Sequence, residues 1–222
     1  MKKGYLIAIG IPVAFVLWVT GLFWFEFYDV HVRYRLTLEV QDGNQIKTGS
    51  SVVEASYDIQ PSWSWSGPNT FVHVEGSEPV VDLGEKGLLL MSFANATRTP
   101  DQIRESNRQF FCAMSDMWCL PFAAYGKSGM GVDTLRDHRK IVVNQLLRES
   151  GPRDVPFGIL PELFRYRDFD DWRRTARVST SNLAMSFGPG VELKRVILEL
   201  TNDPITSASE PLRQWLKKNG II

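Results

Sequence analysis

This sequence has few cysteines, few histidines and no excess of charge of either sign. Two cysteines among 222 residues cannot form a disulfide-dense scaffold, and three histidines leave little material for a metal centre. The 25 basic and 25 acidic side chains cancel, which excludes attraction to nucleic acid or to a membrane surface by bulk charge. Hydrophobic residues make up 44% of the chain, so an intrinsically disordered protein is excluded as well.

One stretch lacks charge altogether. Residues 4–25 carry no charged side chain, and about 20 apolar residues suffice for a helix to span a bilayer. Tyr5 near one end and Trp24 at the other are typical of aromatic belts, and Trp18 lies within the run. Pro12 is tolerated in a membrane helix and suggests a kink. The sequence therefore predicts a single transmembrane helix that contacts the lipid bilayer.

The residues that flank this stretch predict its orientation. Lys2 and Lys3 precede it, whereas Glu26 and Asp29 follow it before any arginine, so the N-terminus is expected in the cytoplasm. A cleaved signal peptide is the main alternative, but the run is longer than an h-region and lacks a small-x-small site. We expect a cytoplasmic stub and an uncleaved signal-anchor within residues 1–30, and one extracytoplasmic domain over 31–222.

The outer part is expected to be α+β, with mostly antiparallel strands and a few short helices. Apolar and polar residues alternate strictly over 31–41 and again in the stretch that ends at residue 59. The turn residues Asp42-Gly43-Asn44 lie between the two stretches, so the sequence predicts a long hairpin. Gly49 in the return strand suggests a bulge. The strand at 190–201 has apolar residues on both faces and is expected to be sandwiched.

Shorter elements are predicted from turn and cap residues. The expected strands are 71–76, 79–84 and 88–93, and the expected helices are 100–115, 180–188 and 209–220. The segment 134–150 fits either a helix or a connection that contains a strand.

Several stretches share a recognisable pattern. They are RYRLTLEVQDGNQIKTGSSVVE at 33–54, PVVDLGEKGLLL at 79–90, and LPEL, FGPGVELKRVILELTNDPIT and PLRQWL across 160–216. This pattern resembles an uncharacterised family of bacterial single-pass membrane-anchored proteins with no assigned activity. Residues 98–150 and the stretch FRYRDFDDWRRTARV depart from it. The resemblance implies a single-pass protein of the bacterial inner membrane with one extracytoplasmic domain in the periplasm, and it supplies no catalytic residue.

The two cysteines, Cys112 and Cys119, are candidates for a local disulfide if the domain lies in an oxidising compartment. Two free buried thiols are the alternative. The spacing is not Cys-x-x-Cys, so the sequence does not indicate an oxidoreductase motif.

Trp63 and Trp65 are the most distinctive aromatic pair. In an extended W-S-W segment both indoles point the same way. They could cover the core beneath a loop, contact a partner or the membrane interface, or stack on a sugar ring.

Other motifs do not indicate chemistry. Gly126-Lys127-Ser128 lacks the earlier glycine of a phosphate loop, because position 121 is proline. The carboxylates near Asp168 lie among arginines that would repel a cation.

Two functions fit the sequence. The first is a non-enzymatic accessory or assembly protein that docks on another membrane protein. The alternative is a glycan-binding module of the cell wall that uses Trp63 and Trp65. We expect no cofactor, no metal, no catalytic residue and no nucleic-acid partner.

Overall fold

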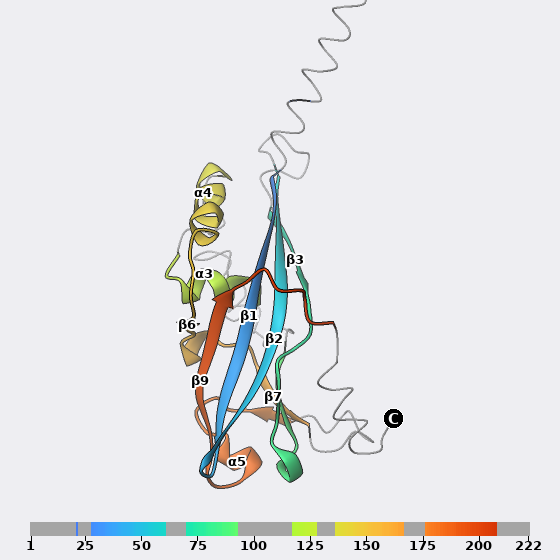
Figure 1. Ribbon diagram of the computed structural model, residues 1–222, viewed down its shortest axis with the longest axis vertical. Helices are drawn as coiled ribbons and strands as arrows, with labels where there is room; N and C mark the ends of the chain where they lie inside the picture. The colour runs from blue at the N-terminus through green and yellow to red at the C-terminus, as the bar shows by residue number, and fades with distance from the viewer. Residues whose placement is uncertain are drawn as a thin grey trace, which may run out of the picture.

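The computed structural model describes residues 28–60, 70–92, 117–127, 136–166 and 176–207, together with Gly21. In these ranges the fold consists of two antiparallel sheets and a few short helices (Figure 1). The expected fold class is confirmed at this level. The predicted membrane span, with Tyr5, Pro12, Trp18 and Trp24, lies outside the described residues. None of the helices in the described ranges combines the length and apolar character needed to cross a membrane.

The larger sheet has the strand order β3-β2-β1-β9-β6. Its strands are β1 (Tyr28–Asp42), β2 (Gln45–Ile59), β3 (Thr70–Glu75), β9 (Val191–Leu200) and β6 (Arg153–Asp154). The smaller sheet has the order β4-β5-β7-β8. Its strands are β4 (Val80–Asp82), β5 (Leu88–Met91), β7 (Leu163–Tyr166) and β8 (Ala176–Val178).

The helices are short. The α-helices are α3 (Leu120–Ala124), α4 (Arg136–Leu146) and α5 (Ala184–Phe187), and the 3₁₀ turns are η1 (Gly84–Lys86), η2 (Met117–Cys119) and η3 (Phe157–Ile159). The segment with two open interpretations therefore forms a helix, α4. In α5 the Asn182 side chain accepts a hydrogen bond from Met185 N at 3.3 Å, and Gly188 ends the helix at φ 96°. The predicted helices at 100–115 and 209–220 lie outside the described residues.

The long hairpin is confirmed. β1 and β2 pair without interruption from Tyr28↔Ile59 to Asp42↔Gln45, around a turn where Gly43 has a φ of 59°. Alternate side chains on both strands face the core, as the period of two predicts. These core-facing side chains are all 0–1% exposed: Val32, Tyr34, Leu36, Leu38, Val40, Val53, Ala55, Tyr57 and Ile59.

The predicted bulge at Gly49 is wrong. Gly49 pairs with Leu38 in the regular register of the hairpin. A Cβ atom at this position would lie 1.9 Å from the carbonyl oxygen of Val80 in β4. Gly49 is therefore required where the backbones of the two sheets come close together, and not because a strand needs an extra residue.

The prediction that β9 is sandwiched on both faces is also wrong. The register of β1 and β9 shifts between Glu39↔Arg195 and Val40↔Leu193, so Lys194 is an extra residue on β9. Such a bulge changes which side chains face the core. The apolar residues before and after it consequently share one face, and Val191, Leu193, Val196 and Leu198 are all buried.

Two core tyrosines fix η2 against the hairpin. The Tyr34 hydroxyl donates to the Met117 carbonyl at 2.7 Å, and the Tyr57 hydroxyl donates to the Trp118 carbonyl at 2.5 Å. Tyr57 also makes edge contacts with the rings of Trp118 and Phe122. These bonds satisfy carbonyl groups where η2 packs on the sheet.

Candidate functional site

The face of β1, β2 and β3 that points away from the core carries a row of polar side chains. Arg33 lies opposite Glu54, and Glu54 lies opposite Glu75 on β3. The next paired row contains His31, Ser56 and His73. Arg33 forms an ion pair with Glu54, and His31 Nδ1 lies 3.0 Å from Glu54 Oε1 and 2.8 Å from Ser56 Oγ. Glu54 is thus the centre of a polar network.

Glu54 is negatively charged although it is buried. Its side chain is only 9% exposed. Burial by itself would raise the pKa of the carboxyl, but the hydrogen bonds and charges of Arg33 and His31 outweigh burial and lower this pKa. Because its oxygens are engaged by neighbouring side chains, Glu54 is suited to holding strands together rather than to transferring protons.

The chain crosses this face after β9. Residues 201–207, which we name the crossing segment, pass in front of β1 and β2 in Figure 1. Thr201 N donates to the Arg33 carbonyl at 3.0 Å, and Thr206 N donates to the Val52 carbonyl at 3.0 Å. Val52 N donates in return to Thr206 Oγ1 at 2.8 Å, and Arg35 pairs with Asp203. The DPIT motif at 203–206 therefore attaches the crossing segment to both long strands.

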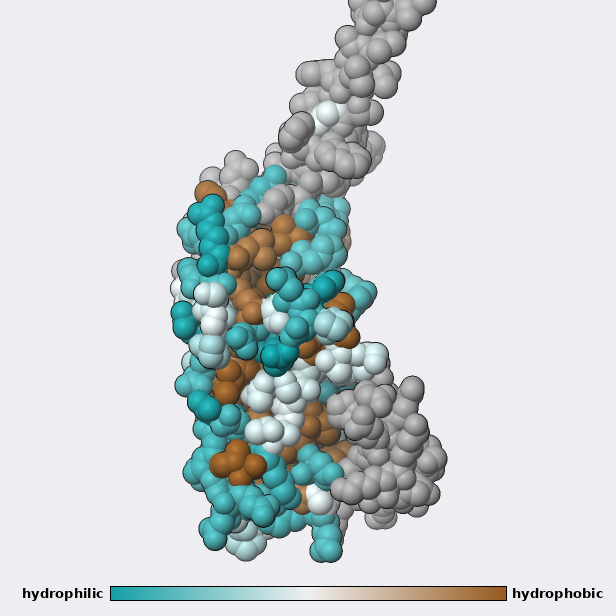
Figure 2. Space-filling model, in the orientation of Figure 1, coloured by the Kyte–Doolittle hydropathy of each residue, from teal (hydrophilic) through white to brown (hydrophobic). Residues whose placement is uncertain are grey.

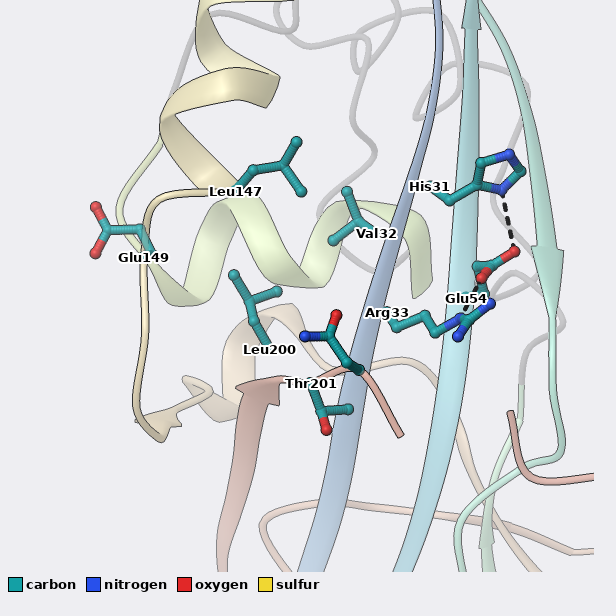
Figure 3. Close-up of a pocket in the computed structure, with 9 residues that line it drawn as sticks. His31, Val32, Arg33, Glu54, Leu147, Glu149, Leu200 and Thr201 are labelled. Atoms are coloured by element: carbon teal, nitrogen blue, oxygen red, sulfur yellow. Dashed lines mark hydrogen bonds and ion pairs between the residues drawn. The ribbon is translucent and has the colours of Figure 1, made fainter. Parts of the chain in front are cut away.

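A hollow of about 290 Å³ opens beside β1 where β9 ends. Val32, Leu147 and Leu200 point into the space between β1 and the chain that follows α4, whereas His31 and Glu54 lie on the other side of β1 (Figure 3). The remaining lining residues are Arg33, Glu149, Thr201 and Asn202. The hollow is at the lower end of the volume range for ligand sites, and polar and charged side chains line it together with a smaller apolar side formed by Val32, Leu147 and Leu200.

Hydrogen bonds hold the far wall of this hollow in place. The Tyr125 hydroxyl donates to the Gly151 carbonyl at 2.6 Å and accepts a hydrogen bond from Leu200 N at 3.3 Å. Lys127 Nζ lies 2.6 Å from Glu149 Oε1, and this hydrogen bond lowers the pKa of Glu149. These bonds connect three separate parts of the chain, namely residues 125–127, residues 149–151 and the end of β9.

A second hollow, of about 440 Å³, lies among η3, β7 and β8. Its lining includes Phe157, Leu163 and Val178, together with the ion pair of Glu162 and Arg177. Within the described ranges, no group of three or more histidine, cysteine, aspartate or glutamate side chains is arranged to hold a metal ion.

The structure describes few of the site residues predicted from sequence. Cys119 is buried and bonded in a disulfide. Cys112 lies outside the described residues, so its pairing with Cys119 stays a prediction. Trp63 and Trp65 also lie outside the described residues, and their contact with a partner, a membrane or a glycan stays a prediction.

The Glu54 network was missed by sequence reasoning, although a signal was present. A two-residue turn at Gly43 and Asn44 fixes the register of the hairpin. Counting back along both strands places Arg33 opposite Glu54, an opposite-charge pair on the outer face.

We expect Glu54→Gln to lower the free energy of unfolding by about 1–2 kcal/mol at pH 7, because the ion pair with Arg33 is lost. The pKa of Glu54 is lowered in the folded protein, so its stabilising effect is present above the unfolded pKa. The difference between variant and wild type should therefore shrink as the pH falls below about 4. Urea unfolding of the full chain in mild detergent measures both effects.

The matched control is Glu75→Gln on β3, since the Glu75 side chain is 57% exposed and pairs only with His73 among the contacts described. It should stay within about 0.5 kcal/mol of wild type. Equal losses in the two variants would contradict a special role for Glu54.

Comparison with family models, with curated proteins and with solved structures finds no match to this chain. The resemblance to membrane-anchored proteins stated from the sequence therefore stays a prediction.

Proposed function

We propose that this chain is a single-pass protein of the bacterial inner membrane, whose periplasmic α+β domain docks on another membrane protein and has no catalytic activity of its own. The carrying observation is where β1 begins. Only Glu26 and Phe27 separate the apolar run at 4–25 from Tyr28, the first residue of β1. Two residues reach at most about 7 Å, so an anchor at 4–25 would hold this end of the sheet at the membrane surface.

The rest of the large sheet would then project away from the bilayer. β1 has 15 residues, which corresponds to about 50 Å of extended chain. It pairs with β2 along its whole length and with β9 over its second half. An anchor placed before β1 would thus hold the domain through a strand that pairs with both of its neighbours, β2 and β9.

The connection that carries Trp63 and Trp65 is attached at the same end of the sheet. β2 ends at Ile59, which pairs with both Tyr28 and Thr70, and Thr70 begins β3. Tryptophan is enriched at membrane interfaces and in partner contacts. Because this end of the sheet would lie at the membrane, the attachment supports contact of Trp63 and Trp65 with the membrane or a membrane protein. It gives less support to binding of cell-wall glycan away from the membrane.

The disulfide at Cys119 and the Glu54 network also support the proposal. A disulfide is expected in the periplasm and rare in the bacterial cytoplasm. The buried carboxylate Glu54 is engaged by Arg33 and His31, which suits a structural role.

The anchor is tested by fractionation. The full chain should remain in the membrane after an alkaline carbonate wash, and protease added to spheroplasts should digest the domain. A variant in which a cleavable signal peptide replaces residues 1–27 should appear in the soluble periplasm. A full-length chain released by carbonate would contradict the anchor.

Docking is tested by purification in mild detergent. We expect a defined complex with at least one other membrane protein. A monodisperse monomer with no co-purifying protein would contradict docking even if the anchor is present.

A further inference from the structure

Among the strands that the structure describes, none pairs with one edge of β1 over its first residues. β2 pairs with β1 from Tyr28 onward, whereas β9 pairs with β1 only from Tyr34. Within the described strands, residues 28–33 of β1 therefore have a neighbouring strand on the β2 side only. Thr201 N donates to the Arg33 carbonyl, which shows that Arg33 directs its backbone groups towards the β9 side. Strand geometry directs those of His31 and Asp29 the same way. Among the described residues, the backbone groups of Asp29 and His31 have no strand partner on this side, whereas the Arg33 carbonyl is already bonded to Thr201 N.

The hollow of about 290 Å³ runs beside this edge. Val32 and Leu200 line it from the sheet, and Leu147, which is 47% exposed, lines it from the chain after α4 (Figure 3). Figure 2 shows hydrophobic surface in the corresponding upper part of the domain, framed by hydrophilic residues. An apolar side chain and an unpaired strand edge are thus available at the same place.

The charges around the hollow are already paired. Glu54 is engaged by Arg33, and Glu149 is engaged by Lys127. An occupant with a strong charge would have to break one of these pairs, so an occupant with apolar side chains fits better.

We infer that the edge at 28–33 binds an extended segment of the partner membrane protein by strand addition, an inference that rests on the proposed function. The segment continues the line of β9, antiparallel to β1, and therefore runs towards the membrane. Alternate side chains enter the hollow beside Val32, Leu147 and Leu200 and are apolar, whereas the others face Arg33 and His31 and are polar. The partner segment is accordingly the stretch that leads into the partner's own membrane span.

The same edge of a second copy of this chain does not pair with it. Copies anchored in the same membrane would both run β1 away from the bilayer, whereas antiparallel pairing requires strands of opposite direction. A partner segment that descends to the bilayer has the required direction.

Site-specific photo-crosslinking tests the inference with the full chain in its native membrane. Benzoylphenylalanine is placed at Leu147, and the control is Ile141 on α4, which is 52% exposed and does not line the hollow. We expect a crosslink from position 147 to one membrane protein, with the linked peptide within about ten residues of a predicted span, and none from position 141. In parallel, Leu147→Asp should reduce the amount of that protein that co-purifies in mild detergent about tenfold. Ile141→Asp should change this amount less than about twofold.

The outcomes separate the two proposals. If a partner co-purifies but position 147 does not crosslink to it, or both positions crosslink equally, the strand-addition site is wrong and docking stands. A linked peptide from this chain, or from a region far from any span, also overturns the site. If no partner co-purifies at all, the proposed function itself fails.

Discussion

Replacing Gly49 with alanine is expected to lower the free energy of unfolding by at least about 3 kcal/mol or to prevent folding. The added Cβ would lie 1.9 Å from the carbonyl oxygen of Val80 and 2.4 Å from its carbonyl carbon. Both are backbone atoms, so no rotamer change relieves the overlap. Val80 is held by its pairing with Leu90 in β5, and Gly49 is held by its pairing with Leu38 in β1. The two sheets would have to separate.

Gly158→Ala is the matched control, because a Cβ at Gly158 has no atom within 4 Å. Urea unfolding of the full chain in mild detergent, followed by circular dichroism, compares the two. Gly158→Ala should stay within about 0.5 kcal/mol of wild type. A Gly49→Ala variant within about 1 kcal/mol of wild type would contradict the close approach of β2 and β4.

The hairpin could be predicted from sequence because its signals are local. Alternation from Val32 to Val40 and the turn at Gly43 concern neighbouring residues, and the structure has the same strands and the same core face. Gly49 was misinterpreted because its neighbour, Val80, is distant in the chain and belongs to the other sheet. A sequence shows that a glycine is present but not which backbone lies against it.

β9 shows a different limit. Its apolar residues change phase at Lys194, and the sequence alone allows two explanations, burial on both faces or one extra residue. The choice depends on how β9 pairs with β1, which is a contact between residues far apart in the chain. The Glu54 network, by contrast, follows from the hairpin register and was accessible to sequence reasoning.

The candidate docking edge could not have been found from sequence. It exists because β9 stops at Leu200, where its backbone N–H donates to the Tyr125 hydroxyl, while β1 and β2 continue towards Tyr28. Where one strand ends relative to its neighbour is a property of the assembled sheet. The length of each strand can be predicted from its own residues, but how far two strands overlap depends on the register in which they pair.

Alkaline pH is expected to unfold the domain through its two core tyrosines. Tyr34 and Tyr57 are fully buried, and burial raises the pKa of both phenols above the value of about 10 in an unfolded chain. Above pH 10 the unfolded chain loses these protons while the folded protein retains them, so ionisation favours unfolding. The free energy of unfolding should therefore fall by up to about 2.7 kcal/mol per pH unit from these two groups.

The variants Tyr34→Phe and Tyr57→Phe separate this effect from other titrations. Each should be less stable at pH 7 by about 1–3 kcal/mol, because the carbonyl of Met117 or Trp118 loses its hydrogen bond. Each should also lose about half of the tyrosine contribution to the slope above pH 10. Lysine titration is common to wild type and variants, so the difference in slope isolates the phenols. Urea unfolding from pH 8 to 11 measures it, and an unchanged slope in both variants would show that neither phenol stays protonated in the folded protein.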